Sequence, residues 1–424
     1  MNATGKTGPN TEMSNKGRVV ILVVAFLGWM FAGTTMAIIP LIGRAAVRSM
    51  GIADESTVGR WFSWYICAFL LGAACGGLLF GWIGDRFGRS KAIAGSILCF
   101  SILTGVTYFV SSPWQLLVLR FFACIGIGGM WPNGVALVSE AWPDVSRPLL
   151  AGLIGTSANL GFMLLSAVSI YHPITTDSWR WVLGFGAAPV VLGVFSLFAL
   201  PESPGWLQST DEKGLAKVPV GTVFRPPYLK LTLLGICLGA IPLMGNWGSA
   251  NWMVPWAGKV GGAADPALKA WTQWCKSGGG AVGALLGGWL ASRFGRRKTY
   301  FAISFFALAT SSYIFFSLDP RSPGFLAWVF AIGFFGTVYF GWLPLFLPEL
   351  FPTEVRATGS GVSFNWGRIL SALGVLITGQ LMIQFNGDYA RVGQITCLVY
   401  VLGLVVIWLA PDTSTTQIGV ESTS

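Results

Sequence analysis

Long apolar runs alternate with short polar loops along almost the whole chain. A run of about 20 apolar residues forms a helix that can cross a hydrocarbon core of roughly 30 Å. The pattern predicts an all-α polytopic membrane protein with twelve transmembrane helices, over residues 19–43, 60–83, 90–110, 114–139, 147–170, 179–200, 230–256, 270–292, 298–318, 323–346, 356–384 and 389–410.

Composition agrees with this pattern and gives an orientation. Of the 424 residues, 54% are hydrophobic and only 10% are charged, against roughly 25% charged residues in soluble proteins. The net charge of +10 does not indicate a nucleic-acid partner, because Lys and Arg first of all orient the helices of a membrane protein. Most of these cations fall in the N-terminal tail and in the loops on its side. This bias predicts that both termini lie in the cytoplasm. We also expect the protein to be a monomer in the lipid bilayer of the cell (inner) membrane.

Few side chains are available for enzyme chemistry. The chain has one histidine, His172, in a predicted loop, and its seven cysteines include no Cys-x-x-Cys pair. A His-based catalytic triad or a multi-His metal site cannot be assembled from these residues. We expect no enzymatic activity, no metal and no cofactor.

An internal repeat divides the chain into two halves. The stretch GWIGDRFGRSK at 81–91 returns as GWLASRFGRRK at 288–298, and EAWPDVSR at 140–147 returns as ELFPTEVR at 349–356. Six predicted spans separate each motif from its copy, so both copies face the same side. The repeat predicts two six-helix halves related by a pseudo-twofold axis along the membrane normal. The expected division is a tail (1–18), a first half (19–207), a linker (208–229), a second half (230–410) and a tail (411–424).

The first motif carries a family resemblance. Its residues Gly81, Asp85, Arg86, Gly88 and Arg89 form a pattern that resembles the signature loop of the major facilitator superfamily. The stretches RFFACIGIGG (120–129), PESPGWL (201–207) and PELFPTEVRATG (348–359) resemble the sugar-porter and metabolite–proton symporter branches, which include aromatic-acid carriers. The resemblance implies a secondary transporter that works by alternating access.

Charged residues at the cytoplasmic ends of the spans are candidates for gating. The resemblance implies that Asp85 caps the eleventh span near residues 357–359, a contact that would join the halves on the inner side. We expect ion pairs between Glu140 and Arg89 and between Glu349 and Arg296. The network is extended by Arg147, Arg356 and Glu202. The alternative for cations at span ends is that they only anchor the helices in the bilayer.

Three cations lie within predicted spans, whereas all 17 acidic residues lie outside the spans or at their edges. A charge inside the bilayer costs at least about 2.5 kcal/mol, so Arg120, Lys276 and Arg368 each need a reason. A substrate carboxylate could take two hydrogen bonds from Arg368 and approach Lys276 as a second charge. The alternative is that these side chains bond backbone carbonyls, which we favour for Arg120 because the sugar-porter-like motif contains it.

Aromatic and amide side chains suggest the rest of a binding site. Trp247 and Asn251 are four residues apart and are expected on one face of the seventh span. Aromatic rings beside amide groups suit a ring-bearing or sugar-like ligand. Further candidates are Trp29, Asn159, Gln273, Tyr339 and Asn365, for each of which helix packing is the alternative.

One departure from the resembled symporters concerns coupling. Those relatives commonly carry acidic residues in the first span after Gly-Trp-x-Phe, whereas GWMFAGTT (28–35) has Ala32 and Thr35 there. The sequence therefore predicts a carrier of a small organic anion (a carboxylate, sugar acid or aromatic acid) without a proton-relay carboxylate. Alternatives are a facilitator or symporter of a neutral sugar or another metabolite, and a transport-inactive receptor on a carrier fold.

Overall fold

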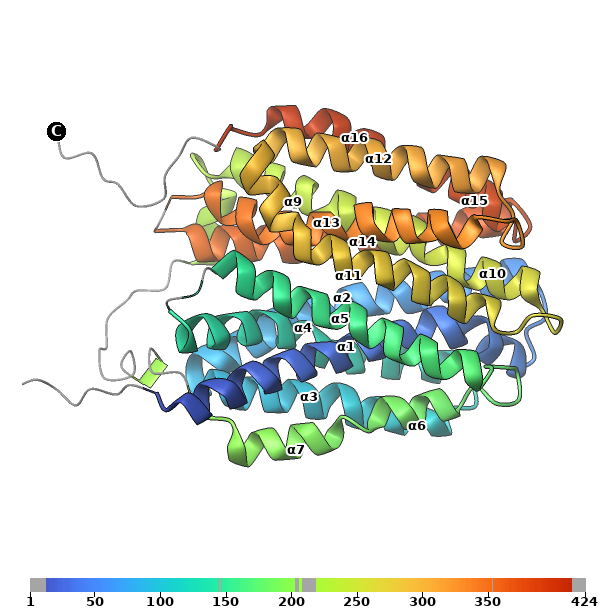
Figure 1. Ribbon diagram of the computed structural model, residues 1–424, viewed down its shortest axis with the longest axis horizontal. Coiled ribbons are helices and arrows are strands. Elements are labelled where there is room, and N and C mark those ends of the chain that lie inside the picture. Colours follow the sequence, from blue (N-terminus) through green and yellow to red (C-terminus); the bar gives the residue numbers. More distant parts are fainter. Residues whose placement is uncertain are drawn as a thin grey trace, which may run out of the picture.

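The computed structural model describes residues 13–143, 145, 147–202, 206–207, 219–352 and 354–413, and every regular element in these ranges is a helix (Figure 1). In the first half the helices are α1 (Asn15–Ser49), α2 (Glu55–Phe87), α3 (Arg89–Val106), η1 (Thr107–Phe109), α4 (Pro113–Ala141), α5 (Arg147–Tyr171), α6 (Trp181–Ala187) and α7 (Val190–Ala199).

The second half repeats this order with a less regular first span. Its elements are η2 (Val220–Phe224), α9 (Leu229–Met244), η3 (Gly245–Ser249), η4 (Ala250–Trp252), α10 (Met253–Gly261), α11 (Leu268–Phe294), α12 (Arg296–Ser317), α13 (Phe325–Glu349), α14 (Arg356–Gln384), α15 (Tyr389–Thr396), α16 (Val399–Val406) and η5 (Ile407–Leu409). Four spans are built from consecutive pieces: α3 with η1, α6 with α7, α9 through α10, and α15 through η5.

The expected twelve spans are confirmed. Eleven helical segments of the described chain are long and apolar enough to cross a membrane. The remaining span is α11, whose 27 residues include polar side chains such as Lys269 and Gln273. The first helix begins at Asn15, before the expected residue 19, because the Ser14 side chain accepts a hydrogen bond from the Gly17 amide.

The two ends of the bundle can be told apart by the chain ends. Figure 1 shows that α1 begins and α16 ends toward the same end of the bundle. We call this end the terminal side and the opposite end the distal side. The motif loops between α2 and α3 and between α11 and α12 both lie on the terminal side.

The repeated motif has the same backbone conformation in both halves. Gly88 separates α2 from α3 with φ of 107°, and Gly295 separates α11 from α12 with φ of 87°. Glycine adopts this region without steric cost, whereas other residues rarely do. The two motifs are therefore structural equivalents, as the repeat predicts.

A row of glycines places α11 directly against α13. A Cβ atom at Gly279, Gly283 or Gly287 would lie 2.0, 2.3 or 2.4 Å from a carbonyl oxygen of α13. Small residues at every fourth position let two backbones approach this closely in a membrane. This contact fixes the position of α11, which carries Lys276.

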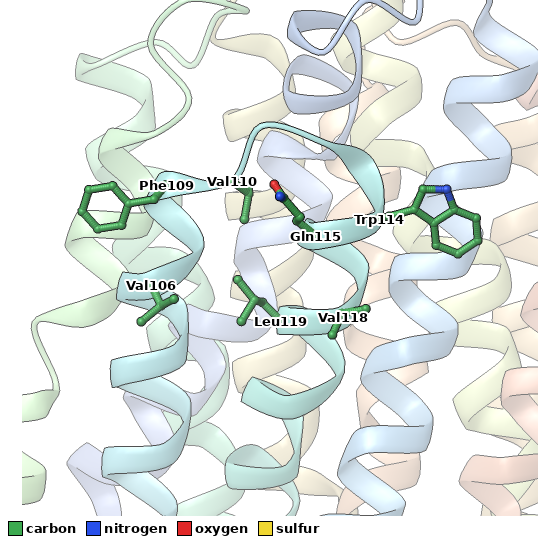
Figure 2. A pocket seen from close by; sticks show the side chains of 7 residues that line it. All are labelled: Val106, Phe109, Val110, Trp114, Gln115, Val118 and Leu119. Carbon is green, nitrogen blue, oxygen red and sulfur yellow. The ribbon is translucent and has the colours of Figure 1, made fainter.

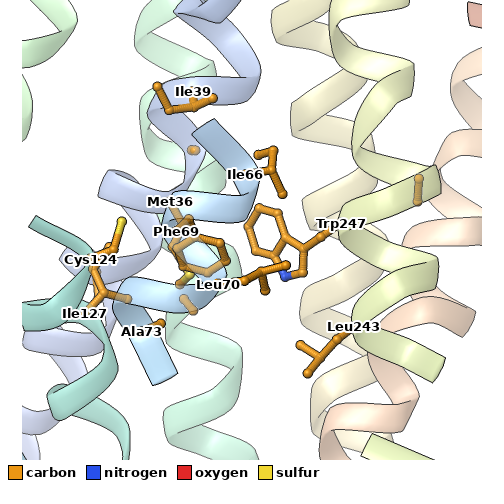
Figure 3. Packing of buried hydrophobic residues seen from close by; sticks show 14 of the residues in the cluster. Met36, Ile39, Ile66, Phe69, Leu70, Ala73, Cys124, Ile127, Leu243 and Trp247 are labelled. Atoms are coloured by element: carbon orange, nitrogen blue, oxygen red, sulfur yellow. The ribbon is translucent and has the colours of Figure 1, made fainter. Parts of the chain in front are cut away.

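The halves meet along α2 with α14 and along α5 with α11. Near the middle of this interface the Trp247 ring reaches from the second half toward Phe69 of α2, with 4.4 Å between ring centroids (Figure 3). Leu243, Leu70 and Ile66 surround this contact. The interface therefore has an apolar, aromatic centre.

A separate hollow lies on the outer surface of the first half. Figure 2 shows it between the distal end of α3 with η1 and the start of α4, lined by Val106, Phe109, Val110, Trp114, Gln115, Val118 and Leu119. Phe109 is 83% exposed and Trp114 is 58% exposed. Exposed apolar side chains of this kind suit contact with lipid tails. The hollow is not part of the interface between the halves.

Candidate functional site

Lys276 lies inside the bundle without an ionic partner. It is eight residues from the start of α11, or about 12 Å below the distal end of this helix. Its side chain is buried, and its ammonium donates a hydrogen bond to Oδ1 of Asn251 in η4. No ion pair of Lys276 is found among the described residues. Among the described residues, the hydrogen-bond partner of this basic side chain is thus an uncharged amide.

Unpaired polar side-chain atoms lie within three residues of Asn251 or Lys276 in the sequence. Asn251 Nδ2, Gln273 Oε1, Trp252 Nε1 and Ser249 Oγ are buried without a hydrogen-bond partner in the described structure. Gln273 uses its Nε2 to donate to Ser277 Oγ over 3.0 Å. Because buried polar atoms are normally paired, a group of four unpaired ones indicates a place for a ligand or for water.

The seventh span is not a regular helix, and this irregularity bears on the expected placement of Trp247 and Asn251. Gly245–Ser249 form a π-helical turn and Ala250–Trp252 a 3₁₀ turn. The backbone here departs from 3.6 residues per turn, and the expectation that Trp247 and Asn251 share a face stays a prediction. Trp247 packs on Phe69 of the first half, whereas Asn251 contacts Lys276 of α11.

Arg120 is a second buried cation with unused donors. Its Nη1 donates to the Thr35 carbonyl oxygen over 2.9 Å, while Nε and Nη2 are buried without partners. The guanidinium lies 5.8 Å from the centroid of the Phe69 ring, which itself contacts Trp247. The alternative that Arg120 only bonds a backbone carbonyl thus accounts for Nη1, whereas Nε and Nη2 have no hydrogen-bond partner among the described residues. The role of Arg120 in binding an anion stays a prediction.

Arg368 joins the halves near the middle of the membrane. Its Nη1 donates to the Ala73 carbonyl oxygen of α2 over 3.1 Å and to Asn365 Oδ1 over 3.2 Å. Its guanidinium also lies 4.7 Å from the centroid of the Phe364 ring. Arg368 lies about 18 Å along α14 from its first residue. The structure therefore gives this arginine a bond across the interface, and its substrate contact stays a prediction.

The other predicted side chains are spread over the bundle. Tyr339 bonds Ser304 Oγ over 2.7 Å and packs beside Tyr300 and Tyr400, inside the second half. Trp29 pairs with Trp131 inside the first half, with 5.2 Å between centroids. Asn159 of α5 faces Gly280 of α11, where an added Cβ would lie 2.5 Å from its Oδ1. Lys276 and Asn251 thus contact each other, and Gln273 lies one helical turn before Lys276 on α11. The contacts of Tyr339 and Trp29 described above are with other residues.

The terminal side carries the expected ion pairs within each half. Arg89 Nη1 lies 2.8 Å from Glu140 Oε1, and Arg296 Nη2 lies 2.7 Å from Glu349 Oε1. Glu202 accepts hydrogen bonds from the backbone amides of Arg89 and Ser90, where it caps α3.

The remaining gating candidates are only partly described. Arg356 donates to the Phe351 carbonyl oxygen over 3.3 Å. The backbone carbonyl oxygen of Asp85 accepts a hydrogen bond from Trp206 Nε1. The expected capping of the eleventh span by the Asp85 side chain stays a prediction. The side chain of Arg147 lies outside the described residues.

The distal side carries contacts between the halves that the sequence did not indicate. Glu55 at the start of α2 takes two hydrogen bonds from Arg44, of 2.8 and 3.1 Å, and a third of 3.1 Å from the Tyr389 hydroxyl of the second half. Lys269 donates to the Ile174 carbonyl oxygen over 2.8 Å, also between halves. The rings of Phe62 in the first half and Trp252 in the second half pack edge to face, with 4.9 Å between ring centroids. We call Glu55, Tyr389, Lys269 and Ile174 the distal latch.

Replacing Tyr389 with Phe removes one bond of the distal latch and keeps the ring. We expect the ratio of the open to the closed distal side to rise roughly tenfold to hundredfold, because a hydrogen bond to a charged group is worth about 1.5–3 kcal/mol. Spin labels on the exposed residues Ala53 and Ala264 of the two halves would measure this as a longer distance distribution. An unchanged distribution would show that the hydroxyl does not hold the halves together.

Other functional residues could have been found from the sequence. Pro411, Asp412 and Thr413 follow the twelfth span as Pro201, Glu202 and Ser203 follow the sixth. Thr413 Oγ1 donates to Glu349 Oε2 over 2.6 Å, and so joins the ion pair of its half. Phe69 gave no such signal, since it is a single aromatic residue in an apolar run.

Comparisons with known proteins agree with this architecture. The chain is 27% identical to the putative niacin/nicotinamide transporter NiaP of Bacillus subtilis, over 94% of this chain and 97% of that protein. It is 28% identical to the cis,cis-muconate transport protein of Acinetobacter baylyi, over 74% and 76%. The partially occluded inward-open structure of the xylose transporter XylE from E. coli has the same fold, with a TM-score of 0.72, 17% identity and coverage of 95% and 100%.

These relatives are transporters and not enzymes. The sequence profile of the Major Facilitator Superfamily matches residues 19–375 and 266–421, which together cover nearly the whole chain. With twelve spans in two repeated halves, the chain belongs to the major facilitator superfamily of membrane transporters.

Proposed function

We propose that this transporter moves a small organic anion across the cell membrane by alternating access. The observation that carries the proposal is the Lys276 ammonium, buried in the bundle with the Asn251 amide as its hydrogen-bond partner. A buried charge without a counter-ion costs several kcal/mol. A carboxylate that binds beside Lys276 removes this cost, so the site favours an anion over a neutral ligand.

The surroundings of Lys276 favour an anion that also carries a ring or an unsaturated chain. Asn251 Nδ2 and Trp252 Nε1 are unpaired donors, and Gln273 Oε1 is an unpaired acceptor. Trp247 and Phe69 supply an aromatic surface near the centre of the interface. The two relatives compared above are named for niacin or nicotinamide and for cis,cis-muconate, and nicotinate and muconate are unsaturated carboxylates of this kind.

The proposed cycle exchanges one closed side for the other. The distal latch closes the outer side in the state described, and its release admits substrate from outside. The ion pairs Arg89–Glu140 and Arg296–Glu349 lie within single halves, so each half, 19–207 or 230–410, can rock as a unit. We further propose that both termini lie in the cytoplasm and that Asp85 joins the halves there when the distal side is open.

A pair of nearly isosteric ligands tests the proposal. The purified protein is reconstituted in liposomes, and uptake of labelled nicotinate is compared with that of nicotinamide, which replaces the carboxylate by a neutral amide. We expect nicotinate to enter at least tenfold faster, with cis,cis-muconate as a competitor. Uptake of nicotinamide or xylose that equals or exceeds the uptake of every carboxylate would contradict an anion carrier.

A further inference from the structure

The path between the halves contains basic groups but no described carboxylate. Glu55 lies at the distal end, and Glu140, Glu202 and Glu349 lie at the terminal side. Three basic side chains lie between these ends. Arg120 and Arg368 keep their protons at all ordinary pH values, because a guanidinium is not deprotonated in proteins. Lys276 is therefore the basic group within the membrane that can both gain and lose a proton.

The elements packed against α11 leave the Lys276 amine without a charged neighbour. They are α13, α5, α10, α12 and α1, with η4 supplying Asn251. Among the described residues, the titratable or charged side chains are Tyr339 and Glu349 on α13, Tyr171 on α5 and Lys259 on α10. Helix α12 carries Arg296, Arg297, Lys298, Tyr300 and Tyr313, and α1 carries Lys16, Arg18, Arg44 and Arg48. Helix α11 itself carries Lys269, Cys275 and Arg293.

The charged groups among these have other contacts or lie at the helix ends. Glu349 pairs with Arg296, and Arg44 and Arg48 lie beside Glu55. Lys259 donates to the Gly387 carbonyl oxygen and Lys269 to the Ile174 carbonyl oxygen. None of them forms an ion pair with Lys276 in the described chain. A substrate is therefore the counter-charge that this site lacks.

We propose that the Lys276 amine carries the proton that couples anion transport to the proton gradient. The inference rests on the proposed function, because the anion is what holds the proton at the site. Enclosing an ammonium with only an amide oxygen for a partner is costly, whereas a neutral amine can still donate one hydrogen bond to Asn251. A bound carboxylate reverses this balance, since it pairs with the ammonium in a strong charge-assisted hydrogen bond.

The charges balance over a cycle. On the entry side the neutral amine takes one proton from water as the carboxylate binds, and an ammonium–carboxylate pair forms. The halves then move with a site that has no net charge. On the exit side the carboxylate leaves and the ammonium releases its proton to water. One monocarboxylate and one proton cross together, and the empty carrier returns with a neutral amine. No membrane carboxylate is needed for this symport.

The test compares three forms of the full-length protein in liposomes with labelled nicotinate as the probe. The wild type, Lys276→Arg and Lys298→Gln are given an acidic exterior or equal pH on both sides. Lys298 is exposed on the terminal side and serves as the matched control. Neutral nicotinic acid leaks through the bilayer in all three preparations, so each signal is corrected with protein-free liposomes.

The wild type and Lys298→Gln should accumulate nicotinate about tenfold per pH unit of gradient at the thermodynamic limit, because one proton accompanies each anion. Lys276→Arg is charged at every pH, so it should still exchange nicotinate for nicotinate but lose the stimulation by acid. A calorimetric titration at pH 8 in two buffers of different ionisation enthalpy should show uptake of up to one proton per nicotinate by the wild type and none by Lys276→Arg.

Three results would overturn the inference. They are wild-type nicotinate transport without proton uptake, acid stimulation that survives in Lys276→Arg, and a folded Lys276→Arg protein that neither binds nor exchanges nicotinate. Each differs from failure of the proposed function, in which the wild type itself transports neither nicotinate nor another carboxylate.

Discussion

Replacing Lys276 with Gln is expected to lower nicotinate uptake at least tenfold while the protein remains folded. Gln can still hydrogen-bond to Asn251, so the change removes the charge and little else. A charge-assisted hydrogen bond is worth about 1.5–3 kcal/mol, which corresponds to roughly a tenfold to hundredfold loss. The melting temperature should not fall, because the neutral Gln side chain can keep the hydrogen bond to Asn251 in the empty site.

Initial uptake rates and thermal unfolding of the purified variant would measure both effects. Lys298→Gln makes the same chemical change at an exposed position and should transport at the wild-type rate. The variant Arg368→Gln tests the second cation separately from Lys276, since the Arg368 guanidinium already donates a hydrogen bond to the Ala73 carbonyl oxygen. Uptake by Lys276→Gln that matches the wild type would mean that Lys276 only anchors the seventh span to the eighth.

Replacing Gly283 with Leu is expected to destroy the packing of α11 on α13. A Cβ atom at this position would lie 2.3 Å from the Phe334 carbonyl oxygen, so the two backbones must separate to admit it. Overpacking a side chain usually costs 1–3 kcal/mol, and a clash with backbone should cost at least about 3 kcal/mol. We expect most of the variant protein to be lost from the folded peak in size-exclusion chromatography.

Gly184→Leu is the control for this change. Gly184 lies in α6, where an added Cβ atom would have nothing within 4 Å, and it is exposed. The same gain of a large apolar side chain should therefore leave the folded yield close to that of the wild type. Equal yields of the two variants would show that the glycines of α11 are not needed for close packing.

The architecture could be predicted because it rests on patterns that are local in sequence. Twelve apolar runs mark the spans, and the repeated loops mark the two halves. Gly88 and Gly295 confirm this equivalence through their positive φ angles. The ion pairs of Arg89 and Arg296 were also predictable, since each pair joins neighbouring motifs on the same side of the membrane.

The site could be predicted only in part, because tertiary contacts decide which polar residues meet. Glu55 and Tyr389 lie 334 residues apart, and no sequence pattern links them. The π-helical turn at Gly245–Ser249 and the 3₁₀ turn at Ala250–Trp252 are departures that a regular helical period cannot anticipate. Lys276 could be identified as a site candidate from the sequence, because a charged side chain within an apolar span is costly whichever way the side chain points.

The most direct test of anion binding at Lys276 is a structure of the wild-type protein with a bound heavy-atom analogue such as 5-bromonicotinate. We predict that the carboxylate lies within hydrogen-bond distance of Lys276 Nζ, with the ring near Trp247 and the bromine between the halves. A complex in which Lys276 still bonds only Asn251, while the carboxylate lies elsewhere in the bundle, would contradict an anion site at this lysine.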